Sequence, residues 1–175
     1  MAPCRRDQAI VRFAGVNRPD QPGFRKGWQK HHLLPRQLLT RRCLATMLAA
    51  VSPGGMWFDD FGTNGVLLPG TEAVAEQERL PLHRGPHKVY NELVFERIGA
   101  VEMEWSRIQS RDERQARHTA RARIGLIQRA LSRRLRGEGD KRLVLNSRDP
   151  IGRGIDYADL DAMAEQIWGA TGPRA

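Results

Sequence analysis

The chain has too little cysteine for a disulfide framework. Only Cys4 and Cys43 occur among its 175 residues, and this also excludes a zinc ribbon built from cysteine pairs. Long apolar runs are missing as well, since no uninterrupted stretch approaches the roughly 20 residues that a membrane-spanning helix needs. The arginines near the start have no apolar run behind them, so no export signal is visible. We expect a soluble, cytoplasmic protein with free thiols and no membrane partner; any delivery to another cell would use a route that the sequence does not display.

Internal repeats and low-complexity tracts are also absent, which excludes a repeat array. A length of 175 residues lies within the usual size of one domain and can bury a substantial core. We therefore predict a single domain over residues 1–175. Prolines and glycines interrupt the first part, so residues 1–23 are expected to form an irregular arm, with Ala9–Ala14 as its one possible strand.

Positive charge is the strongest feature of the composition. Lysine and arginine total 29 against 20 acidic residues, a formal net charge of +9. Such a surplus favours polyanions through the long-range field and through counterion release, so nucleic acid is the first partner to consider. Ribosomal, membrane-surface and other soluble basic proteins share this property. Charge alone therefore does not assign a function.

Most of the surplus lies in residues 107–136, which contain ten arginines and only two acidic residues. Arg107, Arg111, Arg114 and Arg121 recur at helical spacings, and Ile124, Ile127, Leu131 and Leu135 form an apolar stripe. This pattern predicts an arginine-rich amphipathic helix. It is compatible with a solvated face or a docking surface for an acidic protein, but arginine forks suit phosphates, and we favour phosphate binding.

Hydrophobic periodicity predicts short strands among helices, which is an α+β fold. Two apolar segments, residues 31–34 and 66–68, could pair as strands, with Asn64-Gly65 as a turn before the second. Such pairing would bring Asn64 close to the histidines of the first segment. The other expected elements are a helix over 36–50, a loop with one helical turn over 70–82, a helix entered at Gly85-Pro86, a strand at 143–145 and a helix over 156–168.

Four of the five histidines gather in two segments, His31-His32 and His83-Arg84-Gly85-Pro86-His87. Adjacent side chains of an extended segment point to opposite sides, so His31 and His32 cannot easily bind one ion together and are expected to have different tasks. His83 and His87 are four residues apart and can converge on one ion. Phosphodiester hydrolysis needs a base, a Lewis acid and a group that fixes the tautomer of the base; the side-chain oxygen of Asn64 could accept the hydrogen bond that does so.

Three separated blocks carry a family resemblance, and their order matches as well as their character. Together they resemble the AHH-type nucleases of the HNH/endonuclease VII superfamily, also called ββα-metal or His-Me finger nucleases. The resemblance covers about residues 24–98, and Lys30 departs from it because it stands where the family has alanine. The blocks are His31-His32-Leu33-Leu34-Pro35, Asn64-Gly65-Val66-Leu67-Leu68-Pro69 and His83-x-Gly-x-His87-x-x-Tyr90.

The resemblance implies a ββα-metal finger over residues 24–98, embedded in helices, with residues 99–175 as a helical extension. It also implies roles residue by residue. His32 matches the general base, Asn64 the asparagine that orients it, and His87 a metal ligand. His31 takes the place of the other ligand, as in the colicin nucleases. For His83 three roles stay open: metal ligand, contact with the scissile phosphate, or neither.

The predicted function is that of an endonuclease cleaving DNA with little sequence preference, with one divalent ion (Mg²⁺, Mn²⁺ or Zn²⁺) held by His31, His83 and His87. Proteins of this kind often act as bacterial toxins that an acidic immunity protein holds in check. The alternatives are a non-catalytic nucleic-acid-binding module with a structural metal and an RNase, since nothing in the sequence reads the 2′-OH. The residues expected to contact nucleic acid are Lys30, Arg36, Arg84, Lys88, Arg107, Arg111, Arg114 and Arg121.

Overall fold

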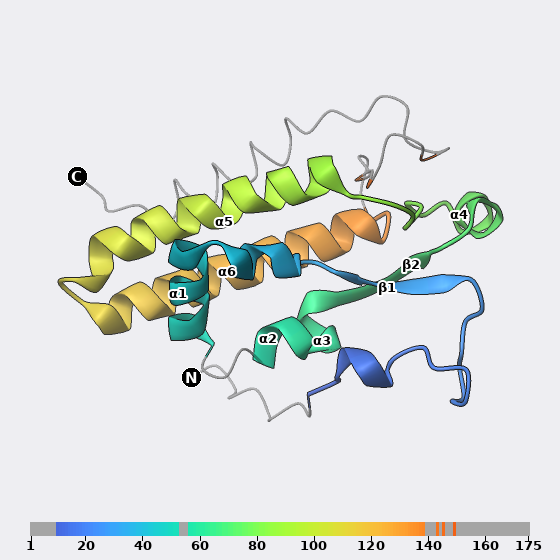
Figure 1. The fold of residues 1–175 in the computed structure, drawn as a ribbon, viewed down its shortest axis with the longest axis horizontal. Helices are drawn as coiled ribbons and strands as arrows, with labels where there is room; N and C mark the ends of the chain where they lie inside the picture. The colour runs from blue at the N-terminus through green and yellow to red at the C-terminus, as the bar shows by residue number, and fades with distance from the viewer. Residues whose placement is uncertain (1–9, 53–55, 139–142, 144, 146–148, 150–175) are drawn as a thin grey trace.

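The computed structural model describes residues 10–52, 56–138, 143, 145 and 149 (Figure 1). In these residues helices surround one two-stranded antiparallel sheet, so the predicted α+β class is confirmed. The helix expected over 156–168 lies outside the described residues, as does part of the strand expected at 143–145. Leu143 and Leu145 themselves are buried in the core.

Strands β1 (Trp28–His32) and β2 (Gly65–Pro69) form the sheet, with His31 opposite Val66 and His32 opposite Gly65. The predicted pairing is confirmed, although β1 starts and ends earlier than the apolar segment 31–34. Beyond His32 the chain leaves the ladder but stays bonded to the residue before β2, since the Leu33 N–H donates to the Asn64 carbonyl at 2.8 Å.

The segment between the strands contains a 3-10 helix η2 (Arg36–Thr40) and the helices α1 (Arg42–Val51), α2 (Met56–Asp59) and α3 (Phe61–Asn64). A continuous helix over 36–50 is therefore wrong. Arg41 is extended and separates η2 from α1. The predicted helical spacing depended on Leu39, which is 41% exposed, whereas the buried Leu38 and Leu44 are six residues apart.

The junction of α3 and β2 differs from the predicted Asn64-Gly65 turn. Asn64 is the last residue of α3 and Gly65 the first of β2, so the pair joins a helix to a strand. A Cβ atom on Gly65 would collide with the ring of Phe61. Gly65 is thus required because the Phe61 ring packs against it. The Asn-Gly pair, which predicted a tight turn, is explained by this packing.

The N-terminal arm also differs from the expected strand over 9–14. Phe13–Gly15 form a 3-10 helix, η1, and among the described residues of that segment Arg12 alone makes a β-bridge, to Asp60. The backbone of the arm is held where it passes α3, because the Phe61 N–H donates to the Val11 carbonyl at 2.6 Å. The arm therefore packs on the ββα core.

After β2 come α4 (Glu72–Glu78), which confirms the helical turn expected in that loop, and two long helices, α5 (Lys88–Gln109) and α6 (Glu113–Leu135). Most residues of the predicted apolar stripes of α5 and α6 are buried, and most charged residues of the two helices lie outside the core, although Arg123 of α6 is only 5% exposed. Asp112 caps α6 by accepting from the Gln115 N–H at 2.8 Å. The helical spacing of arginines from 107 to 121 therefore does not mean one helix, because a turn at residues 110–112 reverses the chain.

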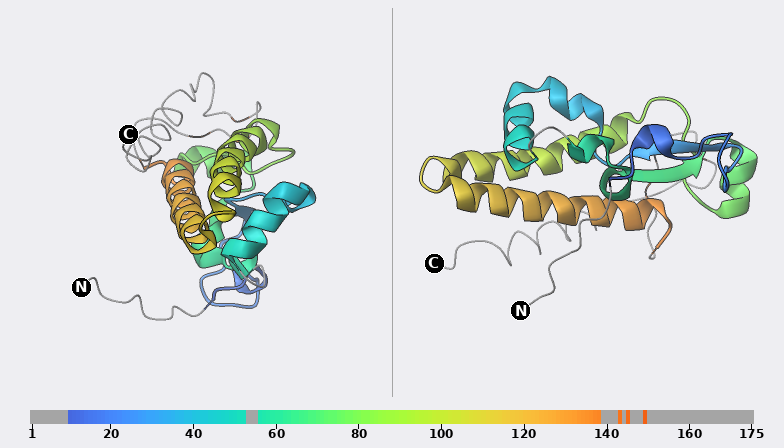
Figure 2. Two further views of the ribbon diagram at one scale, coloured as in Figure 1. Left: turned by 90° about the vertical axis from the view of Figure 1, so that its left-hand side faces the viewer. Right: turned by 90° about the horizontal axis from the view of Figure 1, so that it is seen from below.

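The two long helices lie side by side as a hairpin, and α1 packs against both (Figure 2). The sheet lies at the end of the hairpin where α5 begins and α6 ends, and the α5–α6 turn lies at the opposite end (Figure 1). The core is continuous from β2 through α1 to both long helices. In chain order β1, β2 and α5 form the predicted ββα unit, and α6 braces it.

Candidate active site

The site is built at the sheet end of α5, where three histidines meet. His31, on β1, is buried, and its ring lies 5.0 Å from that of His83 and 5.4 Å from that of His87, centroid to centroid. His83 and His87 are 4.7 Å apart by the same measure. The sequence-predicted ligands are thus brought together by the antiparallel sheet and by the entry to α5.

The segment before α5 places His83 and His87. The His83 N–H donates to the Pro69 carbonyl at the end of β2, at 2.7 Å. Gly85 has φ +79, a conformation that favours glycine, and it turns the chain so that His87 becomes the N-cap of α5. The helix begins two residues after the predicted entry at Pro86, and His87 stands just before its first turn.

The nitrogen atoms of this trio fit a metal ion. One ring nitrogen from each of His31, His83 and His87 can be chosen so that all three lie within 4.8 Å of one another. His31 Nε2 and His87 Nδ1 are buried without a hydrogen-bond partner in the described part of the chain. A buried nitrogen without a partner is costly, and a bound cation would satisfy its lone pair. We refer to these three residues as the histidine trio.

Gln29 fixes the tautomer of His83. The side-chain oxygen of Gln29 lies 2.9 Å from His83 Nδ1, and because an amide oxygen only accepts, Nδ1 carries the proton. Nε2 then keeps its lone pair for a metal. A hydrogen bond of this kind is the usual support of a metal-ligating histidine.

Electrostatics keep the trio neutral, which metal binding requires. Burial lowers the pKa of His31 well below its ordinary value, and the neighbouring His83 and His87 lower it further. Burial also lowers the pKa of His83, to about 4, with His87 and His32 adding to the effect. The pKa of His87 is lowered by burial as well, and the Leu145 carbonyl opposes this.

His32 lies on the other side of β1, as the alternation of the strand predicts. Its ring stacks on Phe13, with centroids 3.8 Å apart and planes inclined by 3°. Burial and the charge of Arg36 lower its pKa, and Asp59 and the Phe58 carbonyl oppose the shift. The imidazole is therefore neutral near pH 7 and able to accept a proton.

Asn64 is buried, but its side chain contacts the backbone instead of a histidine ring. Its Oδ1 accepts from the Leu34 N–H at 2.8 Å and from Gln128 Nε2 at 3.3 Å, and its Nδ2 donates to the Leu34 carbonyl at 3.4 Å. The predicted hydrogen bond from Asn64 to a histidine ring is thus wrong. Asn64 fixes the two residues that follow His32.

Tyr90 on α5 holds the same segment, because its hydroxyl donates to the Leu33 carbonyl at 2.6 Å. We refer to the contacts of Asn64 and Tyr90 with Leu33 and Leu34 as the clamp. Burial raises the pKa of Tyr90, so the phenol remains a donor. The ring also lies edge-on to His31, at 4.9 Å. Leu33 and Leu34 are therefore held by Asn64 on one side and by the helix of His87 on the other.

An open pocket with a volume of about 560 Å³ lies over this arrangement, and both His32 and the trio line it. Three of the predicted nucleic-acid contacts, Lys30, Arg36 and Lys88, also line it. Arg84 stands beside it on the exposed segment between His83 and Gly85 and pairs with Glu72 at 3.7 Å. The pocket thus combines neutral imidazoles with cations at its walls.

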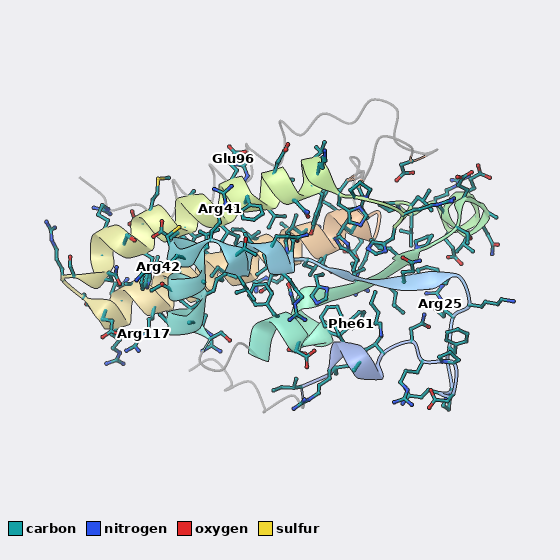
Figure 3. All side chains as sticks on the ribbon, in the orientation of Figure 1. Arg25, Arg41, Arg42, Phe61, Glu96 and Arg117 are labelled. Carbon is teal, nitrogen blue, oxygen red and sulfur yellow. The ribbon has the colours of Figure 1, made fainter. Side chains whose placement is uncertain are left out.

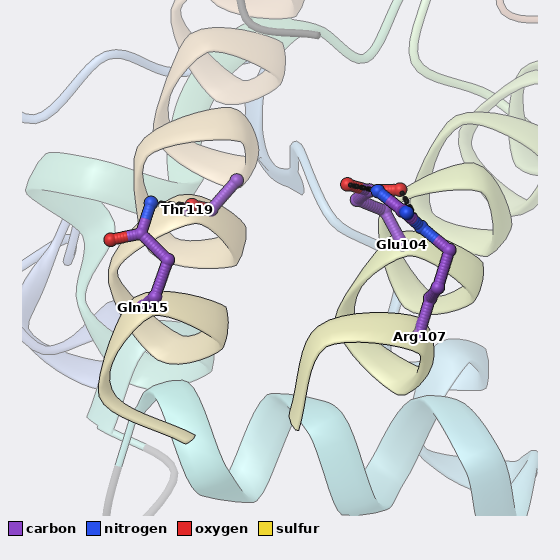
Figure 4. Close-up of polar contacts among 4 residues, drawn as sticks. All are labelled: Glu104, Arg107, Gln115 and Thr119. Atoms are coloured by element: carbon purple, nitrogen blue, oxygen red, sulfur yellow. Dashed lines mark hydrogen bonds and ion pairs between the residues drawn. The ribbon is translucent and has the colours of Figure 1, made fainter. Parts of the chain in front are cut away.

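The other four predicted contacts are not brought to the pocket. Arg107 is near the end of α5 and forms two hydrogen bonds with Glu104, at 2.7 and 3.0 Å (Figure 4). Arg111 and Arg114 are exposed at the α5–α6 turn, and Arg121 is exposed further along α6. Arg117 of α6 and Arg25, which precedes β1, lie at opposite sides of the view in Figure 3.

A comparison with family models shows the class of protein to which the chain belongs. The model of a nuclease family of the HNH/ENDO VII superfamily with conserved AHH matches residues 13–131, more than half of the chain. The chain belongs to this AHH nuclease family. No curated protein and no solved structure matches it significantly.

As an AHH nuclease the protein acts on nucleic acid, and the trio could hold the metal that this superfamily usually uses. The family match extends beyond residues 24–98 in both directions, into the arm that carries Phe13 and through most of α6. No helix in the described ranges has the length and apolar character that crossing a membrane requires.

Several residues of the site were missed in the sequence. For Gln29 a signal existed, because residues two apart on a strand share a face and Gln29 precedes His31 by two. Phe13 and Gln128 carried no such signal, since their contacts with His32 and Asn64 depend on tertiary packing. Tyr90 was visible in the family pattern, but not its bond to Leu33.

Proposed function

We propose that the protein is a metal-dependent endonuclease that cleaves DNA with little sequence preference, with His32 as general base. The observation that carries the proposal is that His32 and the histidine trio open into one pocket from opposite faces of β1. A proton acceptor and a metal site thus stand beside each other without competing for one ion.

In the proposed reaction His32 accepts a proton from a water molecule as the water oxygen forms a bond to phosphorus. The bond from phosphorus to the 3′ oxygen breaks, and that oxygen leaves with the electron pair. His31, His83 and His87 would hold one divalent ion, Mg²⁺, Mn²⁺ or Zn²⁺, which stabilises the negative charge developing on the phosphate and the leaving oxygen when bound. His83 serves as a ligand in this proposal because its Nε2 is left free by the bond to Gln29.

Cationic side chains would hold the phosphate backbone. Lys30, Arg36 and Lys88 line the pocket and are exposed, so they can contact the phosphates next to the scissile one. Contacts to phosphates carry no direct sequence information, in keeping with the proposed cleavage at many sequences. We also propose phosphate contacts for the predicted residues that do not line the pocket, which are Arg84, Arg107, Arg111, Arg114 and Arg121.

Asn64 acts in this proposal by keeping the backbone after His32 in place. The clamp on Leu33 and Leu34 fixes the end of β1, and the direction of the imidazole follows from it. A general base must lie within hydrogen-bond reach of the proton it removes, so a rigid end of β1 is a condition for activity.

Parallel digestion of plasmid DNA and of tRNA tests the substrate, with Mg²⁺, Mn²⁺ and Zn²⁺ each supplied to metal-free protein. DNA cleavage that EDTA abolishes supports the proposal. Faster cleavage of tRNA would make the protein an RNase. No cleavage with any ion, together with unfolding on metal removal, would favour a nucleic-acid-binding module with a structural metal.

The most specific part of the proposal is a bacterial toxin acting in the cytoplasm of its target, with an acidic immunity protein as partner. The net charge of +9 supports an acidic partner. Induced expression in a bacterial host should stop growth, whereas His32→Ala should not. Equal growth with both would contradict the toxin role without affecting the nuclease proposal.

A further inference from the structure

The side chain of Phe13 covers one face of the His32 ring. The two rings are parallel within 3° at 3.8 Å, and Phe13 is only 7% exposed although its neighbours in the arm lie at the surface. Parallel stacking at van der Waals distance leaves the imidazole no room to rotate through the space that the phenyl ring occupies. Phe13 precedes the ββα unit, so it belongs to neither strand nor to the metal helix.

Two contacts hold Phe13 directly, and two more hold the arm next to it. The Phe61 ring meets it edge-on at 5.1 Å, and Lys30 Nζ donates to its carbonyl at 2.9 Å. The arm is also held at Val11, whose N–H lies 3.3 Å from Asp60 Oδ1 and whose carbonyl accepts from the Phe61 N–H. The arm is thus attached to the α3 segment and to β1, the strand of His32 itself.

The edge of the His32 ring is restrained less than its face. Among the described residues, Arg36 and Asp59 act on the pKa of His32 through their charges, and the Phe58 carbonyl acts on it through a hydrogen bond. The torsion that turns an imidazole about its Cβ–Cγ bond is broad, so one edge contact leaves the ring a wide range of orientations. The stacked Phe13 removes most of that range.

We infer that Phe13 is a positioning residue for His32, and that the arm before the ββα unit is thereby part of the active site. The inference rests on the proposed function, in which His32 is the base. The histidine trio lies on the other face of β1 and does not contact Phe13. Loss of the Phe13 ring should therefore slow the chemical step without weakening metal binding or substrate binding.

The test compares the full chain with two ringless variants, Phe13→Leu and Phe13→Met, which keep an apolar side chain in place. Phe13→Tyr keeps the ring. The matched control is Phe24→Leu, the same change at a phenylalanine that is 40% exposed and directly follows the arm. The measurements are kcat and KM for plasmid cleavage, Mn²⁺ affinity by calorimetry, circular dichroism, and the His32 ring-proton signals in the metal-free protein by NMR.

The ringless variants should lose about tenfold in kcat, less than the hundredfold or more expected for loss of a general base, with KM and Mn²⁺ affinity unchanged. Phe13→Tyr and Phe24→Leu should keep the wild-type kcat. Protons above the face of an aromatic ring resonate upfield, so the His32 signals should move downfield in the ringless variants alone.

If both ringless variants cleave with the kcat of the wild type, the inference is overturned and the proposed function stays intact. Unchanged His32 signals would overturn it independently of catalysis. A loss of Mn²⁺ affinity or of helical circular dichroism parallel to the loss of kcat would also overturn it, because Phe13 would then act on the fold. A wild-type protein that cleaves nothing would overturn both proposals.

Discussion

At the residue scale the adjacent histidines of β1 are set apart by alternation along the strand. His31 faces inward to His83, His87 and Tyr90, whereas His32 faces the arm and stacks on Phe13. This division could be predicted, because it follows from the period of an extended chain. The meeting of His31 with the second histidine pair could be predicted from the resemblance alone, since some 50 residues separate the two blocks.

The role of Gln29 gives the first prediction. Gln29→Leu removes the acceptor for His83 Nδ1, so His83 loses the contact that fixes its tautomer. Mn²⁺ affinity should fall by roughly 10- to 100-fold, as is usual when a partner of a ligating histidine is lost. Gln37→Leu is the control, since Gln37 lines the same pocket and, in the described part of the chain, its side chain forms no hydrogen bond with the trio. Equal affinities of the two variants, measured by calorimetry, would contradict the tautomer argument.

At the element scale α6 is more than a basic surface. Its Gln128, only 6% exposed, donates to Asn64 Oδ1, so this helix outside the ββα unit supports the clamp on Leu33 and Leu34. The sequence predicted the apolar stripe and the charge of α6 but not this contact. A buried glutamine among arginines has no distinguishing pattern, and the turn at residues 110–112 that directs α6 back to the site was missed.

A double-mutant cycle tests this support. Asn64→Ala leaves the Leu34 N–H without its acceptor in a buried position and should lower the free energy of unfolding by about 1–3 kcal/mol. Gln128→Leu should cost about 1 kcal/mol, and the double variant should cost less than the sum of the two. The measurement is urea denaturation, with Asn91→Ala as the control at the pocket wall. Strict additivity would show that Gln128 and Asn64 do not act together.

At the scale of the whole molecule the cations predicted to contact nucleic acid lie in two separate regions. Lys30, Arg36 and Lys88 line the pocket with the trio, whereas Arg111 and Arg114 lie at the α5–α6 turn, at the other end of α5. A helix of 22 residues is about 33 Å long. Composition predicted the overall charge and the nucleic-acid partner, but it could not predict this separation, which results from the reversal of the chain between α5 and α6.

The separation predicts a dependence on duplex length. A duplex of about 10 base pairs spans the length of α5, so only longer DNA can contact both the pocket cations and the arginines at the α5–α6 turn. Arg111→Gln with Arg114→Gln should weaken binding of a duplex of about 24 base pairs and reduce the salt dependence of log K by about one unit per lost contact. Binding of a duplex of roughly 6 base pairs should not change, whereas Lys30→Gln with Lys88→Gln should weaken both. Fluorescence anisotropy at several salt concentrations measures this, and wild-type affinity of the hairpin variant for the long duplex would remove these arginines from the interface.

The central claim is that adjacent histidines have separate tasks, His32 as base and His31 as ligand. The most direct measurement is cleavage of plasmid DNA and Mn²⁺ affinity, determined together for His32→Ala, His31→Ala and the control His118→Ala, an exposed histidine of α6. His32→Ala should lose roughly 100-fold or more in kcat and bind Mn²⁺ as the wild type does. His31→Ala should lose both, and His118→Ala neither. Wild-type cleavage by His32→Ala, or loss of Mn²⁺ binding in that variant, would contradict the account.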